Sequence, residues 1–146
     1  MKNLSVALIA LLGTAAVSAQ DLNPADVPQD LRDTFEQAHP NASDVEWERE
    51  GDSYKVEFEV DYQDQEVWYS ADGQTNKMEK DIKEDELPQA ISSAISDKYA
   101  DYKVDSIEMT EENGKTTYEV ELEKGWDDEI NVVFDADGKV LNEWKD

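Results

Sequence analysis

The chain contains one sequence pattern twice, and this repetition limits what it can fold into more than any other feature. The stretch SYKVEFE at 53–59 returns as TYEVELE at 117–123, and ADG at 71–73 returns at 136–138. The first pair is separated by sixty-four residues and the second by sixty-five. Self-similarity at a nearly constant spacing is typical of a duplicated structural unit, in which each copy folds in the same way. We therefore predict a tandem repeat.

Each copy opens with a predicted helix, introduced by Val27-Pro28 in the first copy and by Leu87-Pro88 in the second. Proline is tolerated in a first helical turn, where its missing N–H has no partner to lose. Apolar residues then recur three or four positions apart, as on one helix face: Val27, Leu31, Phe35 and Ala38, and later Leu87, Ile91, Ala94, Ile95 and Tyr99. The correspondence places the copies at about residues 24–82 and 83–146.

Apolar and polar residues alternate through the rest of each copy, which predicts strands with one buried face. Turn sequences separate these strands at 51–53 in the first copy and at 112–115 in the second. A last strand is expected at about 74–80 and again at about 139–145. The predicted unit is one helix followed by four antiparallel strands, an α+β arrangement that occurs twice.

The second ADG lies in FDADGK, where Asp135, Asp137 and Gly138 resemble the start of a calcium-binding EF-hand loop. Such a loop needs an oxygen ligand at its fifth position and glycine at its sixth. Counting from Asp135, these positions hold Lys139 and Val140. Asp-Gly between two strands instead favours a two-residue hairpin turn, in which both central residues have positive φ. We therefore interpret both ADG segments as hairpin turns.

Longer stretches carry a family resemblance: VPQDLRDTFEQAHPNASDVEWE, YKVEFEVD and YSADGQ in the first copy, and LPQAISSAISDKYADYKVDSIE, YEVELEKG and FDADGK in the second. Together they resemble the periplasmic PepSY-like, β-lactamase-inhibitor-protein-like family of Bacteroidetes-type bacteria. The resemblance implies one continuous, curved, eight-stranded antiparallel sheet with both helices on one face. It also implies export to the periplasm, no known catalytic residues, and a role described as inhibitor-like or calcium-regulated.

Residues 1–19 have the layout of a secretory signal peptide. Lys2 precedes an apolar run from Leu4 to Leu12, and Val17-Ser18-Ala19 offers a small-residue cleavage site. The apolar run is shorter than the roughly 20 residues that a membrane-spanning helix needs. We therefore expect residues 20–146 to form a single periplasmic domain that does not insert into the membrane.

Composition excludes several classes of function. The chain has 37 acidic and 13 basic residues and a formal charge of −24, which becomes −25 when Lys2 is removed. This charge repels nucleic acids and anionic lipids and favours basic partners, cations or simple solubility. Without cysteine, disulfides and thiolate metal sites are excluded. His39, the only histidine, lies beside Pro40 at a helix end with no marked nucleophile, so we expect no catalytic residues and no zinc site.

Strand alternation assigns side chains to two faces of the sheet. The face under the helices is predicted to hold Val45, Trp47, Tyr54, Val56, Phe58, Val67, Tyr69, Val120, Leu122, Val132 and Phe134. The opposite face is predicted to hold Glu46, Glu48, Lys55, Glu57, Glu59, Glu66, Trp68, Glu119, Glu121, Glu123, Asn131 and Val133. Like charges that face each other across strands cost up to about 1 kcal/mol per pair. A basic partner or cations would relieve this repulsion.

We interpret the acidic face as the binding surface for a protein or peptide, with a solvated surface that binds nothing as the alternative. The predicted binding residues are Trp68, Val133, Glu57, Glu59, Glu121, Glu123 and Trp126. Trp144 is expected to pack at the edge of the sheet. The leading hypothesis is a monomeric, exported, non-catalytic binding protein that inhibits or regulates an envelope enzyme.

The alternative hypothesis is a calcium-responsive protein with no other cofactor. Acidic residues gather on two equivalent hairpins, DYQDQE at 61–66 and GWDDE at 125–129. Calcium prefers six to eight oxygen ligands, many of them carboxylates. The predicted ligands are Asp61, Asp64, Asp127, Asp128 and Glu129, with loop solubility as the competing explanation.

Overall fold

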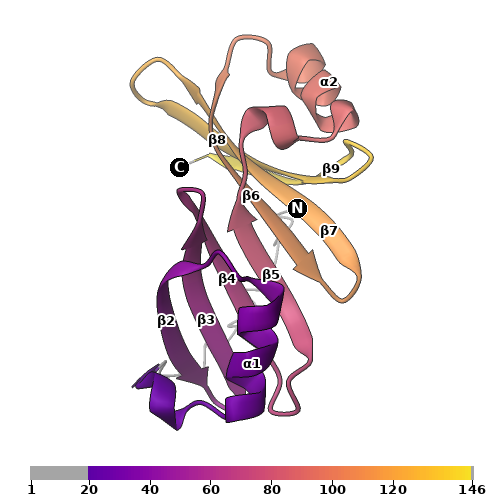
Figure 1. Cartoon of the computed structure of the whole chain (residues 1–146). Helices are drawn as coiled ribbons and strands as arrows, with labels where there is room; N and C mark the ends of the chain where they lie inside the picture. The colour runs from indigo at the N-terminus through magenta and orange to yellow at the C-terminus, as the bar shows by residue number, and fades with distance from the viewer. Residues whose placement is uncertain (1–19, 146) are drawn as a thin grey trace, which may run out of the picture.

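A computed structural model of the chain describes residues 20–145, so the predicted signal peptide at 1–19 lies outside the described residues. The first half contains β1 (Gln20–Leu22), α1 (Gln29–Ala38), β2 (Ser43–Glu50), β3 (Ser53–Val60), β4 (Gln63–Tyr69) and β5 (Thr75–Asp81). The second half contains α2 (Gln89–Lys98), β6 (Lys103–Glu112), β7 (Lys115–Lys124), β8 (Asp128–Asp135) and β9 (Val140–Lys145). The order of one helix followed by four strands therefore occurs twice (Figure 1).

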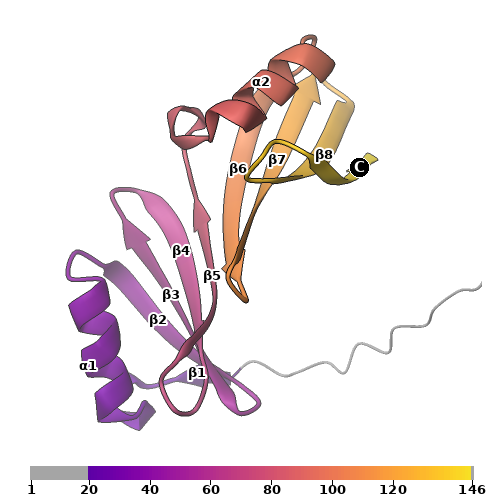
Figure 2. The same cartoon turned by 90° about the vertical axis from the view of Figure 1, so that its right-hand side faces the viewer.

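The nine strands within residues 20–145 form one open antiparallel sheet, in which each strand pairs with its neighbours in the sequence. The α+β prediction is confirmed, but the expected number of eight strands is wrong. The additional strand is β1, which pairs with β2 through Gln20↔Arg49 and Leu22↔Trp47. A strand of three residues is too short for an alternating pattern to reveal. Figure 2 shows that the sheet is bent, with α1 against one part of it and α2 against another.

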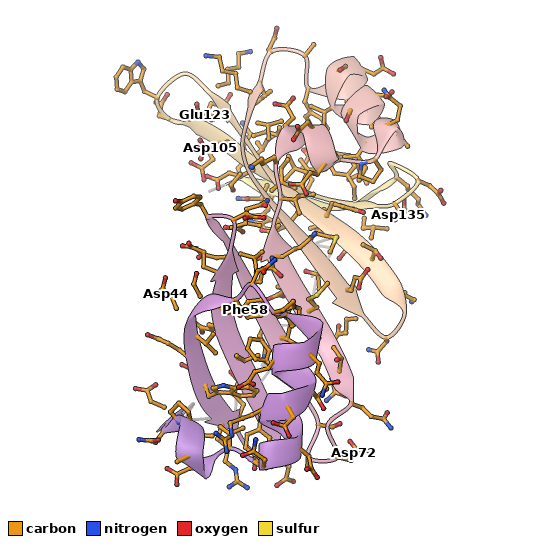
Figure 3. All side chains as sticks on the ribbon, viewed as in Figure 1. Asp44, Phe58, Asp72, Asp105, Glu123 and Asp135 are labelled. Atoms are coloured by element: carbon orange, nitrogen blue, oxygen red, sulfur yellow. The ribbon has the colours of Figure 1, made fainter. Side chains whose placement is uncertain are left out.

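Each helix packs onto strands of its own half and closes a separate core. The first core contains the buried residues Val27, Leu31, Phe35, Trp47, Val56, Phe58, Val67 and Tyr69. The second contains Ile82, Leu87, Ile91, Ile95, Tyr99, Ile107, Val120, Leu122, Ile130, Val132 and Phe134. The predicted core is confirmed, with Val45 and Tyr54 half-buried against the first cluster. Phe58, labelled in Figure 3, lies beside α1, and the centre of its ring is 5.0 Å from that of Phe35. In the described part of the chain, neither helix has the length and hydrophobicity needed to cross a membrane.

The β8–β9 connection is a hairpin turn, as predicted, but not the expected two-residue type. Gly138 has a φ of 79°, whereas Asp137 is not in the positive-φ region. The N–H of Gly138 donates to the carbonyl oxygen of Asp135 at 3.0 Å. Asp135 Oδ1 also accepts the N–H groups of Asp137 and Lys139, each at 3.0 Å. The turn is therefore longer than two residues and ends on Gly138 in the left-handed conformation. The Asp135 carboxylate stabilises this turn by accepting the backbone N–H groups of Asp137 and Lys139.

Candidate binding surface

The face of the sheet opposite the buried residues consists of rows of side chains, because directly paired residues on neighbouring strands share a face. One row joins four glutamates through the pairs Glu46↔Glu57, Glu57↔Glu66 and Glu66↔Glu79. Val56, next to Glu57 in the sequence, is fully buried on the other face. The predicted binding residue Glu57 therefore lies within an unbroken line of like charges across β2 to β5. Such a line destabilises the sheet unless cations lie beside it.

Lys55 is one of the cations that lie beside this row. Its Nζ lies 2.5 Å from Glu57, 3.1 Å from Glu66 and 3.9 Å from Glu48. Burial alone lowers the pKa of Lys55, but the hydrogen bonds to Glu57 and Glu66 outweigh burial and raise that pKa well above its ordinary value. Lys55 therefore remains charged and offsets part of the repulsion between the glutamates. On β5, two strands away from Lys55, Lys77 forms an ion pair with Glu79.

Trp68 lies between these two lysines. The centre of its ring is 5.4 Å from Lys55 Nζ and 4.4 Å from Lys77 Nζ, a double cation–π arrangement. Its indole Nε1 donates a hydrogen bond to Glu50 Oε2 at 3.1 Å. The ring is half-buried by these contacts instead of standing free as an apolar anchor. Its role in binding a partner stays a prediction.

The acidic face continues into the second half, because Asp81 pairs with Glu108 and Glu108 pairs with Glu119. The predicted binding residues Val133, Glu121 and Glu123 lie here, in the pairs Glu119↔Val133, Glu121↔Asn131 and Glu123↔Glu129. Glu59 lies in the first half, where it pairs with Asp64. Val133 is half-buried, and Asn131 is only 8% exposed although its neighbours on this face are not buried. In the second half, the smaller Val133 occupies the position that corresponds to Trp68. Val133 pairs with Asn142 on β9. Trp144 lies on the edge strand β9 and pairs with Asn131.

Two hairpins at one end of the sheet each expose an aromatic ring. Tyr62, between β3 and β4, is 95% exposed, and Trp126, between β7 and β8, is 103% exposed. Both turns lie at the same end because β3 and β7 run in the same direction in a sheet of alternating strands. Trp126 was predicted from the sequence and Tyr62 was not. The signal was present, since the repeated turns DYQD and GWDD each hold an aromatic residue.

The predicted calcium ligands are divided between the same two hairpins. Asp61 and Asp64 lie on the first, and Asp127, Asp128 and Glu129 lie on the second. Asp128 binds Lys145 Nζ at 2.6 Å and the Tyr102 hydroxyl at 2.9 Å, and these hydrogen bonds lower the pKa of its carboxyl. Within residues 20–145, no three histidine or carboxylate side chains are gathered to hold a metal ion. Calcium binding stays a prediction without a preassembled site.

His39 belongs to the aromatic core of the first half. Its backbone N–H donates to the carbonyl oxygen of Phe35 at 2.8 Å, which ends α1. The centre of its ring lies 5.2 Å from the ring centre of Phe35 and 4.6 Å from that of Phe58. Burial lowers the pKa of the imidazole, so it is neutral at neutral pH.

Solved structures of similar fold come from Bacteroides species. A BLIP-like protein from Bacteroides fragilis is 26% identical with a TM-score of 0.65, covering 85% of this chain and 87% of that one. A DUF2874 family protein from Bacteroides uniformis is 20% identical with a TM-score of 0.66, covering 82% and 89%. A "putative periplasmic" protein from Bacteroides eggerthii is 19% identical with a TM-score of 0.67, covering 82% and 88%.

No curated protein sequence matches the chain. The family described as "Putative beta-lactamase-inhibitor-like, PepSY-like" matches residues 16–63 and 52–142, which together span most of the sequence. The helix and strand arrangement agrees with the similar structures, and the matched residues include both hairpins with exposed rings. The chain therefore belongs to the PepSY-like, β-lactamase-inhibitor-like family.

Proposed function

We propose that this protein is a non-catalytic, exported binding protein that recognises a basic surface on a protein or peptide partner. The observation that carries the proposal is the full exposure of Tyr62 and Trp126 on two hairpins at one end of the sheet. A large aromatic ring that lies wholly in water contributes nothing to the core, whereas it stabilises a complex strongly when a partner buries it. Membership of an inhibitor-like family supports an envelope enzyme as the partner.

The register of β5 and β6 supports a further part of this proposal, that both helices cover the same face of the sheet. Met78 packs against the first core and Met109 against the second. Met78 pairs with Glu111, and Lys80 pairs with Met109. Because Met78 and Lys80 are two positions apart on one strand, their side chains and those of their partners share a face. The repeated units then leave the other, acidic face open along its whole length.

Charge determines which partners this face attracts. The residues left after removal of the signal peptide carry a formal charge of −25, obtained from −24 by subtracting Lys2. The row of Glu46, Glu57, Glu66 and Glu79 concentrates part of that charge on the open face. A basic partner is drawn to such a field and associates faster at low salt, while its contact with the exposed rings sets how slowly it leaves.

Affinity capture from envelope extract tests the proposal. Wild-type protein, the double variant Tyr62→Ser with Trp126→Ser, and the control variant Leu141→Ser are compared as baits by quantitative mass spectrometry. Leu141 is a matched control because it is 50% exposed but lies on β9, away from both hairpins. We expect a partner whose recovery falls at least tenfold with the double variant and is unchanged with Leu141→Ser.

The captured partner is then purified and its binding is measured by calorimetry at low and high salt. An enzyme that is inhibited by the wild-type protein and not by the double variant supports the inhibitor-like role. Equal recovery of every captured protein by all three baits contradicts a binding role for the two hairpins.

A further inference from the structure

A groove of about 530 Å³ lies on the helix side of the first half, between α1 and β2. Its apolar wall is formed by Phe35, Val45 and Trp47, and its polar wall by Arg32, His39 and Glu36. A volume of this size, with aromatic walls and a few polar groups, is typical of ligand sites in proteins. The groove is separate from the acidic face, since Val45 and Trp47 belong to the opposite face of β2.

The groove runs beside an uncovered part of a sheet edge. β1 pairs only with Trp47, Glu48 and Arg49 of β2. Beyond Leu22 the chain turns away at Asn23, whose side chain accepts the N–H of Ala25 at 3.0 Å. The next residue, Pro24, has no N–H and cannot extend the strand. Within residues 20–145, no strand pairs with the outer side of β2 over residues 43–46, a stretch that contains a bulge with Asp44 at a φ of 51°. An unpaired strand edge of this kind is a place where a further extended segment can add.

Arg32 provides a positive charge in this groove without a matching anion. Its Nη2 donates to Gln29 Oε1 at 2.5 Å, while its buried Nε has no hydrogen-bond partner. Arg32 forms no ion pair with a described residue. A buried donor that lacks an acceptor is costly, and a carboxylate supplies two acceptors in the geometry of a guanidinium. His39 is uncharged at neutral pH and Glu36 is an exposed carboxylate, so a negative group is favoured only at the Arg32 end.

The second half offers an internal comparison. A groove of about 450 Å³ lies at the corresponding place beside α2, lined in part by Ile95, Tyr99 and Val104. Sixty residues after Arg32 the sequence has Ser92. β5 pairs with β6 only over Glu108–Glu112, so residues 103–106 of β6, like residues 43–46 of β2, have no strand partner on that side among the described residues. Tyr99, in the place of His39, donates its hydroxyl to Glu143 at 2.6 Å. The two grooves therefore share an unpaired stretch of strand, and the guanidinium of Arg32 is the feature that the second groove lacks.

We propose that the groove of the first half binds the C-terminal end of an extended peptide. Two or three peptide residues add to the free edge of β2, the mode known as strand addition. The last side chain, which is apolar, packs against Trp47 and Phe35, and the terminal carboxylate binds Arg32. This site is distinct from the acidic face and the hairpin tips, so it provides a second surface for recognition.

Nuclear magnetic resonance with isotope-labelled protein tests the proposal. The probes are acetyl-Lys-Thr-Val-Thr-X peptides, in which X is Val, Leu, Phe or Tyr, each made with a free C-terminal carboxylate and as the C-terminal amide. We expect at least one free acid to shift the amide resonances of residues 43–47 and to bind at least tenfold more tightly than its amide. The comparison uses unaltered protein and therefore does not depend on the folding of a variant.

Two arginine variants identify the group that recognises the carboxylate. Arg32→Gln should reduce the preference for the acid over the amide to less than twofold. Arg49→Gln should leave that preference unchanged, because Arg49 lies on β2 with its Nε bonded to the carbonyl oxygen of Gly51. Three results overturn the proposal: no peptide shifting residues 43–47 at millimolar concentration, equal binding of acid and amide, or a full acid preference in folded Arg32→Gln. None of them bears on the hairpins, because Tyr62 and Trp126 remain intact in all three proteins.

Discussion

At the scale of single residues, two glycines in corresponding turns share a positive φ, but only one of them lies in close contact with another part of the chain. Gly73 and Gly138 have similar positive φ values of 82° and 79°. A Cβ added at Gly73 meets nothing within 4 Å, whereas one added at Gly138 lies 2.5 Å from the carbonyl oxygen of Ala90. The turn between β8 and β9 therefore touches the first turn of α2, and this contact leaves no space for a side chain.

Alanine substitution at each glycine measures the two effects. Gly73→Ala should lower the free energy of unfolding by about 1–2 kcal/mol, the usual cost of a left-handed conformation in a residue with a Cβ. Gly138→Ala should lower it by more, because α2 or the turn must also move. Urea unfolding followed by circular dichroism gives both values. Equal losses in the two variants would show that the contact with Ala90 has no energetic weight.

Glu108 provides a prediction about pH. Burial, followed by the charges of Glu79 and Glu119, raises the pKa of its carboxyl above the ordinary value. The folded protein therefore binds a proton more readily than the unfolded chain, and the charged form of Glu108 destabilises the fold at neutral pH. Glu108→Gln should raise the melting temperature at pH 7, and the gain should disappear as the pH falls below about 4, where both states are protonated.

The matched control for this experiment is Glu111→Gln, because Glu111, like Glu108, is an exposed glutamate of β6 but pairs with Thr116 and not with another glutamate. It should change the melting temperature much less at either pH. A gain from Glu108→Gln that persists unchanged at low pH would mean that its cause is not the removal of a charge.

At the scale of elements, the hairpin between β3 and β4 combines an exposed ring with an unfavourable backbone. Asp61 and Tyr62 have φ values of 53° and 64°, a region that is rare for a residue as bulky as tyrosine. Backbone strain of this kind persists at functional sites when the side chain serves a purpose. The conformation therefore agrees with the proposed use of Tyr62 in binding.

Tyr62→Gly should stabilise the protein and weaken its binding at the same time. Glycine adopts positive φ without a penalty, so we expect the free energy of unfolding to rise by about 1 kcal/mol. Loss of the ring should lower recovery of the partner in the capture experiment. Thermal melting and capture measured on the same preparation test both parts, and unchanged recovery together with higher stability would separate the strain from function.

The elements that the sequence predicted are those with a strong periodic pattern. The helix faces of Leu31 and Ile91 and the alternation around Val56 and Val120 are set by local spacing, so both cores were predictable. β1 was missed because three residues carry no period and its pairing with β2 depends on the fold. The contacts of Trp68 were equally out of reach, since Lys55 and Lys77 lie on neighbouring strands and only the strand register brings them to the ring.

At the scale of the whole molecule, net charge and like-charge rows predict how stability responds to salt. Raising ionic strength from about 0.01 M to about 1 M shortens the Debye length from about 30 Å to about 3 Å. The few ion pairs weaken under this change, but the repulsion within a formal charge of −24 for the full sequence weakens more. Sodium chloride should therefore raise the melting temperature steadily.

Calcium and magnesium chloride at equal ionic strength distinguish screening from a specific site. Because the predicted ligands are divided between two hairpins, we expect the two salts to raise the melting temperature equally. A larger shift with calcium, together with a saturable heat in calorimetry, would support the calcium-responsive alternative and contradict this expectation.

The strand order of the sheet has a consequence for how the molecule assembles. Each strand is bonded to the strands that precede and follow it, so no pairing has to skip over an intervening strand. Closing short loops costs little entropy, and chains dominated by nearby pairings reach the native state quickly. Folding can begin at any hairpin and continue by adding the neighbouring strand on either side. Pairing of β5 with β6 then joins the two halves of the sheet.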